Sequence, residues 1–209
     1  MYSDRLFTGM DQRDVEPGVL LLSAPLPEGM EERVIGESGG KTSTLRAPMM
    51  VLQYQPPFCT MIRLDQRTDE AAITLLPKWM EFISKPQVVY RGGEDFTNGV
   101  RIVGALRPGA PTPEGSVRIG DHFVVVDTSK GPSQEHIDAL EGVRVFRGVV
   151  TIYTKDLEEQ IANGEWYVTT LLNSDILAPG SADIWGDAMR RQDFPLPLFA
   201  TYPKDLNDA

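Results

Sequence analysis

Two parts of the sequence combine residue types that bind ligands or move protons. Arg91-Gly-Gly-Glu-Asp95 follows a run typical of a strand, and its paired glycines permit positive φ angles and a tight exit. A turn is the simplest interpretation of this motif, and a ligand that approaches bare backbone is the alternative. A predicted helix after Thr154 carries three carboxylates, Asp156, Glu158 and Glu159, which we interpret as a solvated face near the helix N-terminus.

We expect these two parts to meet in one binding groove. Carboxylates that converge in a groove have shifted pKa values, and such shifts mark functional sites. The candidate groove residues are Asp65, Arg91, Gly92, Gly93, Glu94, Asp95, Leu157 and Glu158.

A glycine-rich segment, Gly36-Glu-Ser-Gly-Gly-Lys-Thr42, is similar to a phosphate-binding loop. That loop needs a Gly-x4-Gly-Lys-Thr turn between a strand and a helix. Here Ile35 occupies the position of the first glycine, so the spacing is short by one residue. The sequence that follows is a poor helix, because Pro48 would end it early. We interpret the segment as a flexible loop that does not bind nucleotides.

The histidines and the cysteine do not form a recognisable catalytic or metal-binding pattern. His122 and His136 are the only histidines, and neither belongs to a His-x3-His or His-Glu-x2-His motif. A Ser-His-Asp arrangement stays open, although no Gly-x-Ser-x-Gly elbow occurs. The single cysteine, Cys59, excludes an intramolecular disulfide and a thiolate zinc site, and we interpret it as a small buried hydrophobe. We expect no cofactor and no metal.

The charge of the chain disfavours two classes of partner. The 209 residues include 30 acidic and 20 basic side chains, which gives a net charge of −10. Nucleic acids and anionic membranes attract basic surfaces, so both are unfavourable partners. The chain has no apolar run of about 18 residues and no secretory signal at its N-terminus. We therefore expect a cytoplasmic protein that does not bind membranes.

The pattern along the chain predicts a mixed α/β domain over residues 17–206, preceded by a flexible tail over residues 1–16. A long loop is expected at about 25–47. Helices are predicted from Thr68 to Ile83, where Pro77 implies a kink or two shorter helices, over 132–140, from Thr154 to 162, and from a cap at Ser181. Strands are predicted over residues 18–24, 48–54, 59–64, 87–90, 99–103, 116–119, 122–126, 143–146, 149–153 and 165–171, and an extended segment over 195–202.

Several blocks give the chain a family resemblance. They are Gly18-Val-Leu-Leu-Leu-Ser, Val88-Val-Tyr-Arg-Gly-Gly, Asp183-Ile-Trp-Gly, Arg190-Arg-Gln and Ala200-Thr-Tyr-Pro-Lys-Asp-Leu206. In this order the blocks resemble the AlgH/YqgE family of small bacterial proteins, and the last three look most like actinobacterial members. The resemblance covers roughly residues 17–206. It implies a bifurcated β-sheet, part of it closed into a small barrel, with helices around it, and it implies no cofactor.

Departures from the family pattern concern glycines. A family Gly-x-x-Gly is replaced here by Phe58-Cys-Thr-Met61, and Gly-Gly-Pro becomes Gly92-Gly93-Glu94. If the family glycines shape a groove, this divergent member has altered it. The biochemical role of the family is unsettled, and proposals run from transcriptional regulation to protein interaction.

The sequence therefore favours a non-enzymatic regulatory or protein-interaction module. Its expected interaction surface lies around Arg91–Asp95, with Asp65 and the helix after Thr154. A small-molecule-binding protein or minor enzyme that uses a groove near Gly92-Gly93 is the alternative, and a direct DNA-binding regulator is a weaker one. We expect an unidentified protein partner and a monomer or weak homodimer.

Overall fold

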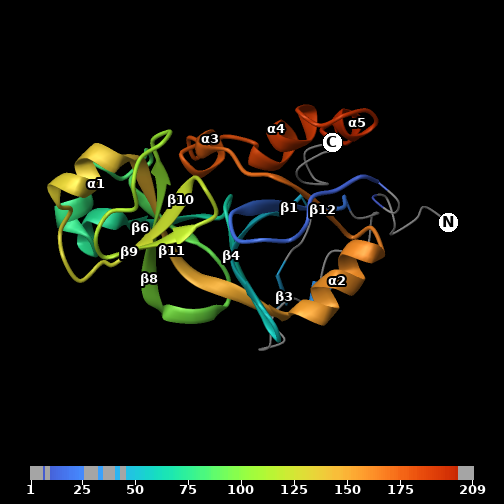
Figure 1. Cartoon of the computed structure of the whole chain (residues 1–209), viewed down its shortest axis with the longest axis horizontal. Helices are drawn as coiled ribbons and strands as arrows, with labels where there is room; N and C mark the ends of the chain where they lie inside the picture. Colours follow the sequence, from blue (N-terminus) through green and yellow to red (C-terminus); the bar gives the residue numbers. More distant parts are fainter. Residues whose placement is uncertain (1–6, 8–9, 26–32, 35–40, 43–45, 202–209) are drawn as a thin grey trace.

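The computed structural model describes residue 7 and residues 10–25, 33–34, 41–42 and 46–201 of the chain. A ten-stranded, mainly antiparallel sheet curls through the molecule, and helices lie on both sides of it (Figure 1). The strand order is β12-β1-β4-β5-β11-β8-β10-β9, with β7 paired to β11 and β6 paired to β7. The strands of this sheet are β1 (Val19–Ser23), β4 (Pro48–Gln55), β5 (Phe58–Arg63), β6 (Arg67–Ala71), β7 (Val88–Arg91), β8 (Asp95–Leu106), β9 (Ser116–Ile119), β10 (Phe123–Val126), β11 (Leu140–Tyr153) and β12 (Trp166–Thr170).

The helices are short, and most follow the last strands. They are α1 (Gln134–Ala139), α2 (Thr154–Ala162), α3 (Asn173–Ile176), α4 (Ile184–Arg190) and α5 (Leu196–Phe199), with 3₁₀ turns η1 (Ala72–Thr74) and η2 (Pro77–Trp79). A separate pair of strands, β2 (Arg33–Val34) and β3 (Lys41–Thr42), lies within the loop predicted at 25–47. Residues 26–32, 35–40 and 43–45 of that loop, with most of the Gly36–Thr42 motif, lie outside the described residues.

The long strand β11 divides the sheet into two branches. In its first half, Val145 pairs with Ile102 of β8 on one side and with Val89 of β7 on the other. Further along, Val150 pairs with Met61 of β5. One branch therefore contains β5, β4, β1 and β12, and the other contains β8, β10, β9, β7 and β6. The mixed fold and the bifurcated sheet are as expected.

The second branch curls into a half-barrel. Its outer strands, β6 and β9, are not paired with each other in the described part of the chain, so the small closed barrel implied by the resemblance is open on this side. Trp79 of η2 and Ala139 of α1, together with Leu76, belong to one buried core with residues of β7, β8, β10 and β11.

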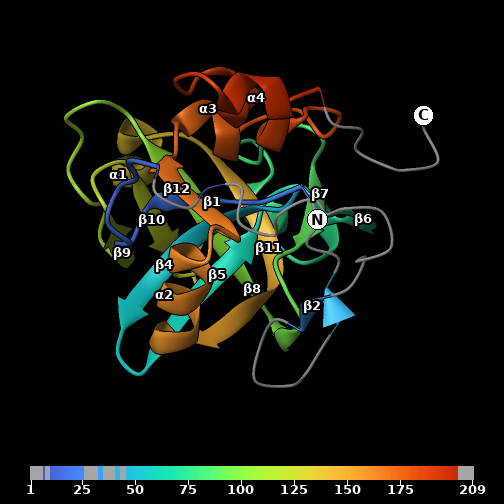
Figure 2. The same ribbon diagram turned by 90° about the vertical axis from the view of Figure 1, so that its right-hand side faces the viewer.

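The first branch is covered on both faces, which explains its apolar sequence. Leu20 and Leu22 of β1 belong to a core shared with Trp185 and Met189 of α4. Leu21, which points to the other face, belongs to a second core that includes Leu157 of α2. Figure 2 shows α3 and α4 above the sheet and α2 against β4 and β5. Successive side chains of β1 point to opposite faces of the sheet, and both faces are covered. All of its side chains are therefore buried, and its sequence does not alternate between apolar and polar residues.

A buried cation attaches α4 to the sheet. The guanidinium of Arg46 pairs with Asp183 and lies 4.8 Å from the centre of the Trp185 ring. The carboxylate of Asp183 also accepts a hydrogen bond from the backbone N–H of Gly186. Asp183, rather than the expected Ser181, therefore caps the helix.

Three glycines let the chain cross itself where the sheet divides. Gly92 donates its N–H to the carbonyl of Arg147 at 2.7 Å, and its own carbonyl accepts from Arg63 at 2.8 Å. A Cβ on Gly93 would lie 2.2 Å from the Val149 carbonyl, and one on Gly148 would lie 2.2 Å from the Gly93 oxygen. No side chain fits between these backbones, so the close contact requires glycine at all three positions.

The helix predicted from Thr68 to Ile83 is wrong. Residues 67–71 form β6 instead, and the hydroxyl of Thr68 donates to the carbonyl of Val89 at 2.6 Å. The apolar residues whose spacing indicated a helix lie instead on and around the 3₁₀ turns η1 and η2, which bury Ala72 and Trp79. Short 3₁₀ turns and a helix bury residues at similar spacing, so periodicity does not separate them.

The described part of the predicted N-terminal tail is docked. Phe7 is buried, with its ring 5.5 Å from that of Tyr167. The backbone N–H of Arg13 donates to the carbonyl of Val168, and the side chain of Gln12 accepts from the N–H of Val168. The segment thus satisfies backbone groups along the outer edge of β12, which an edge strand otherwise leaves open.

Other predicted boundaries shift in the structure. The two strands expected over 143–146 and 149–153 are one strand, β11, with an irregularity at Gly148. Thr154 is the first residue of α2 rather than its cap, which is Tyr153. The segment 195–202, expected to be extended, contains α5. Within the described residues, no helix has both the length and the apolar character needed to cross a membrane.

The glycine crossing predicts a difference between two alanine substitutions. Gly148 and Gly109 both have positive φ angles, of 75° and 73°, but a Cβ at Gly109 would meet nothing within 4 Å. Gly109→Ala should lower the free energy of unfolding by about 1–2 kcal/mol through backbone strain alone. Gly148→Ala should lower the free energy of unfolding by about 1–3 kcal/mol more than Gly109→Ala does, because the added Cβ would overlap the backbone oxygen of Gly93. Urea denaturation measures both, and equal losses would show that the crossing is not tightly packed.

Candidate functional site

The predicted groove residues do not meet in one place. Asp65 and Arg91–Asp95 lie near the glycine crossing, at the end of β5 and between β7 and β8. Glu158 lies on α2 and accepts a hydrogen bond from the hydroxyl of Tyr54, which pairs with Cys59 near the start of β5. β5 has six residues, a length of roughly 20 Å at about 3.3 Å per residue. The structure therefore places Glu158 about the length of a strand away from Asp65, which follows the other end of β5.

Several of these residues have structural roles. Leu157 is fully buried in the core beneath α2, so it does not line a groove. Gly92 and Gly93 are buried against β11, so no bare backbone faces a ligand there. Asp65 forms a nearly buried ion pair with Arg63, with 2.6 Å between Oδ1 and Nε. Gly92 and Gly93 belong to the glycine crossing, and a turn, rather than a ligand site, describes these two glycines best.

The charged residues of the turn remain at the surface. The guanidinium of Arg91 and the carboxylate of Glu94 lie 2.5 Å apart in a partly exposed ion pair. Asp95 accepts a hydrogen bond from the N–H of Thr151 at 2.9 Å, which fixes the start of β8 on β11. Arg91 and Glu94 are therefore accessible, whereas Asp95 is held by the sheet.

The structure adds a residue that the sequence did not single out, Phe96. Its side chain is 70% exposed, and its φ of 52° is positive. Asp95 pairs with Val149 and Val100 pairs with Arg147, so residues 96–99 bulge out opposite Gly148. Positive φ is a genuine outlier for a bulky residue. The only sequence signal for this bulge is Asn98-Gly99, a pair typical of turns.

Ion pairs hold the base of this bulge. Arg147 binds Glu70 of β6 through two contacts, Nη2 to Oε1 at 2.8 Å and Nε to Oε2 at 3.2 Å. Its Nη1 also donates to the carbonyl of Thr97 at 3.2 Å. Paired contacts of this kind fix geometry better than a single ion pair. Phe96 thus projects from a constrained segment that lies between two ion pairs, Arg147 with Glu70 and Arg91 with Glu94.

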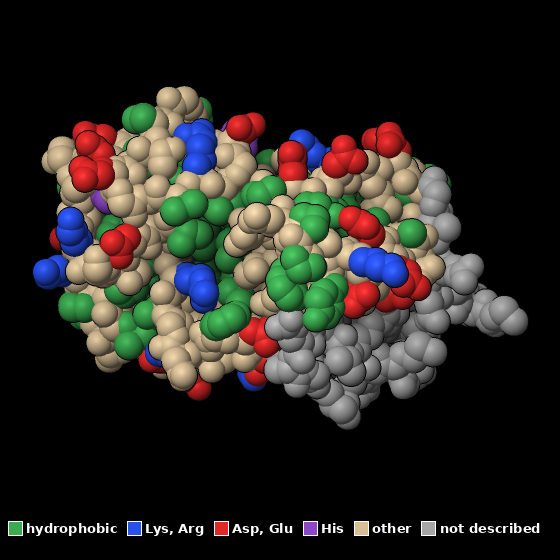
Figure 3. Space-filling model, turned by 60° about the horizontal axis from the view of Figure 1, so that its bottom comes forward, with side chains coloured by type: hydrophobic (Ala, Val, Ile, Leu, Met, Phe, Trp, Pro, Cys, Tyr) green, Lys and Arg blue, Asp and Glu red, His purple; other side chains and the backbone are tan. Residues whose placement is uncertain are grey.

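A second group of exposed aromatic residues lies where β11 meets α2. The rings of Phe58 and Tyr153 are 5.1 Å apart, and the two residues are 37% and 48% exposed. Figure 3, which brings the lower edge of Figure 1 forward, shows hydrophobic side chains in groups across the middle of this face, with Lys and Arg beside them.

Burial makes the thiol of Cys59 unreactive. The side chain is fully buried in the core beneath α2. Burial raises the pKa of the thiol to about 12, because the thiolate would lose its hydration. Cys59 is therefore a neutral core residue, as the sequence analysis expected.

His136 is buried between two serines. Its Nδ1 lies 2.7 Å from Ser133 Oγ, and its Nε2 lies 3.3 Å from Ser116 Oγ. Its ring also contacts the edge of Trp79, with 5.3 Å between ring centres. Burial lowers the pKa of the imidazole, so the neutral form is favoured. The ring joins α1 to the half-barrel.

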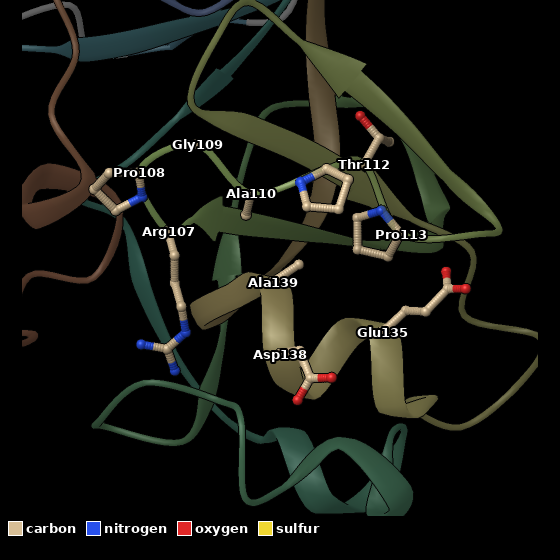
Figure 4. Close-up of a pocket in the computed structure, with 10 residues that line it drawn as sticks. Arg107, Pro108, Gly109, Ala110, Thr112, Pro113, Glu135, Asp138 and Ala139 are labelled. Carbon is tan, nitrogen blue, oxygen red and sulfur yellow. The ribbon is translucent and has the colours of Figure 1, made fainter.

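A pocket of about 560 Å³ opens between α1 and the loop that follows β8. Arg107 to Pro113 form one wall, and Glu135, Asp138 and Ala139 of α1 form the other (Figure 4). No local pattern in the sequence marks this pocket, because its walls are about 25 residues apart in the chain. Within the described ranges, no three His, Cys, Asp or Glu side chains group as metal ligands, and the pocket's acidic residues are only two.

These features define a class of protein: a curled, bifurcated half-barrel with helices on both faces. The model of a family described as AlgH-like (DUF179) matches residues 52–197, and the chain belongs to this AlgH-like family. The resemblance that the sequence blocks indicated is thus confirmed.

Similar proteins from actinobacteria cover between 78% and 99% of the chain. A UPF0301 protein of Corynebacterium efficiens is 35% identical over 99% of this chain and 98% of its own length. A UPF0301 protein of Mycobacterium tuberculosis is 31% identical over 78% of this chain and 81% of its own length. This is a family of uncharacterised proteins, and these names state no activity.

Two solved structures share the fold. The crystal structure of protein DIP2367 from Corynebacterium diphtheriae has a TM-score of 0.82 at 32% identity and covers 97% of this chain and 100% of that one. The solution structure of the AlgH protein from Pseudomonas aeruginosa has a TM-score of 0.56 at 12% identity, over 93% and 98% of the two chains. The second likeness concerns the fold alone.

The contact between Tyr54 and Glu158 predicts a titration. The hydrogen bond to Glu158, followed by partial burial and the charge of Glu158, raises the pKa of the Tyr54 phenol to about 12. Glu158→Gln should bring this pKa back toward 10.0, the ordinary value, because the carboxylate no longer opposes the phenolate. Ring NMR signals measured against pH, with Tyr54 assigned from Tyr54→Phe, report the change. An unchanged pKa would mean that the contact does not form in solution.

The burial of His136 predicts a dependence of stability on pH. Its folded pKa lies below the unfolded value of 6.5, so the unfolded state takes up a proton first as the pH falls. The stabilisation from the neutral ring should be complete above pH 6.5 and should decline as the pH falls toward the folded pKa. His136→Gln retains a side chain that suits this capping position and does not titrate. Urea denaturation at several pH values should show the advantage of wild type over variant shrinking below pH 6.5.

Proposed function

We propose that this protein is a protein-interaction module and that the bulge of β8 is its contact surface. The surface, called here the β8 bulge surface, consists of Glu70, Arg91, Glu94, Phe96 and Arg147. It contains the charged residues of the turn around which the sequence analysis expected an interaction surface. The observation that carries the proposal is the conformation and exposure of Phe96.

Phe96 combines two unfavourable features without a benefit inside the monomer. Positive φ at a bulky residue costs of the order of 1–3 kcal/mol, and such strain persists only where surrounding structure imposes it. Here the pairing of Asp95 and the contacts of Arg147 with Glu70 and Thr97 supply that constraint. The exposed ring gains little from burial in the described fold. Strained, exposed aromatic residues of this kind are suited to bind a partner.

The surroundings of Phe96 fit an interface. Aromatic residues dominate binding energy at interfaces when polar contacts around them exclude water. The ion pairs Arg91–Glu94 and Arg147–Glu70 offer both charge signs near Phe96, so the partner is expected to be a protein with complementary charges.

A regulatory role would then act through protein contacts in the cytoplasm. Direct DNA binding fits poorly, because a net charge of −10 opposes the phosphate backbone. We expect the module to recognise its partner as a monomer or weak homodimer.

Replacing Phe96 with asparagine tests the proposal. Asparagine tolerates positive φ better than phenylalanine does, so Phe96→Asn should fold with unchanged or higher stability. Val117→Asn is the matched control, because Val117 is 66% exposed on β9, outside the bulge. Immobilised wild type and both variants are compared for capture of proteins from an extract of the source cells, with quantitative mass spectrometry.

We expect a partner whose recovery falls at least roughly tenfold with Phe96→Asn, a loss of about 1.4 kcal/mol, and stays unchanged with Val117→Asn. If no captured protein depends on Phe96, or if Val117→Asn has the same effect, the β8 bulge surface is not the contact surface. Thermal unfolding of each variant separates a lost contact from a lost fold.

A further inference from the structure

The pocket beside α1 has walls that are fixed before any ligand arrives. Three prolines, Pro108, Pro111 and Pro113, restrict the backbone of one wall. The N–H of Arg107 donates to the carbonyl of Ala139 at 2.8 Å, which ties the start of the loop to α1. A rigid wall reduces the entropy lost on binding.

Hydrogen bonds fix the far end of the same wall. The N–H of Glu114 donates to the carboxylate of Glu135 at 2.8 Å, and Ser116 donates its N–H to the carbonyl of Pro113 at 3.1 Å. The hydroxyl of Thr112 accepts from the guanidinium of Arg118 at 3.1 Å. The loop is thus attached to α1 at both ends and to β9 at its centre.

The charged groups of the pocket have a definite arrangement. Glu135 and Asp138 both belong to α1, and Figure 4 shows the Glu135 carboxylate directed toward the loop near Pro113 and the Asp138 carboxylate directed away from the loop. Arg107 extends from the opposite wall, and Figure 4 shows its guanidinium and the Asp138 carboxylate directed to the same side of the pocket. The side chain of Arg107 has no ion-pair partner in the part of the chain that the structure describes.

From this arrangement we infer that the pocket binds a small cationic amino-acid-like ligand. The carboxylate of such a ligand lies against Arg107, and its ammonium or guanidinium groups lie against Asp138 and Glu135. Two acidic groups and one basic group give the pocket a net charge of −1, which a ligand with one carboxylate and two cationic groups neutralises. The methylene chain of the ligand packs on the apolar floor formed by Ala110 and Ala139.

The size of the pocket agrees with this class of ligand. A volume of about 560 Å³ lies within the usual range of about 300–1,000 Å³ for small-molecule sites, and it accommodates one amino acid or a short peptide end. The charged groups are exposed, so water weakens each ion pair. We therefore expect a dissociation constant of roughly 0.1–1 mM for a single amino acid.

This pocket is a separate site from the β8 bulge surface. It lies beside α1, whereas the bulge lies at Gly148 in the middle of β11. The inference does not depend on the proposed interaction function. The outcome of the Phe96 capture experiment does not bear on ligand binding in the pocket, and the outcome of the ligand titration does not bear on the β8 bulge surface.

NMR titration of the full-length protein with L-arginine tests the inference. Saturable chemical-shift changes are expected at residues 107–113 and along α1. L-Citrulline has the same length and keeps the α-ammonium but has a neutral group in place of the guanidinium, and agmatine lacks the carboxylate. Each of these two probes should bind at least roughly tenfold more weakly than L-arginine, because each loses one charge-assisted contact.

Variants of the exposed pocket residues supply the second measurement. Asp138→Asn and Arg107→Gln should each weaken L-arginine binding by roughly tenfold while circular dichroism and melting temperature stay close to wild type. Asp156→Asn, which removes an equally exposed carboxylate from α2, controls for the overall negative charge and should have no effect. Shifts spread over the whole acidic surface, equal binding of L-citrulline, or unchanged binding in Asp138→Asn would each overturn the inference.

Discussion

The structure depends on a backbone contact that only glycine allows. The chain between β7 and β8 crosses β11 at Gly148, and Gly92 and Gly93 lie so close to that strand that a Cβ on either would overlap its backbone. This contact lets β11 pair with β7 and β8 in its first half and with β5 in its second half. The division of the sheet, and with it the half-barrel, follows from the absence of three side chains.

The helices complete the cores that the divided sheet leaves open. α4 is attached by Arg46, which pairs with the cap residue Asp183 and contacts the ring of Trp185. A second buried arginine, Arg144, donates to the carbonyl of Ala178 and lies 4.4 Å from the centre of the Tyr90 ring. Both arginines join the sheet to the C-terminal segment. Cation–π contacts and hydrogen bonds compensate part of the cost of burying these charges.

The two proposed sites are consequences of this architecture. At the crossing, four residues of β8 lie opposite the single residue Gly148 of β11, so residues 96–99 bulge outward and Phe96 is exposed. At the other end of the same strand, β8 continues into the proline-containing loop that faces α1. One long strand thus positions both an exposed aromatic residue and a preformed pocket.

The sequence by itself determined several local features of the chain. The apolar run in β1, the burial of Cys59, the helix after Thr154 and the membership of the AlgH-like family were all predictable, because local pattern and composition carry that information. Only the tertiary structure decided what those segments pack against. Thr68 belongs to a strand because β7 offers it a partner, and Glu158 is separated from Asp65 because α2 packs at the opposite end of β5. Gly92 and Gly93 suited a turn or a ligand site equally well in the sequence, and the position of β11 determined their role, since close contact between distant backbones leaves no local signal.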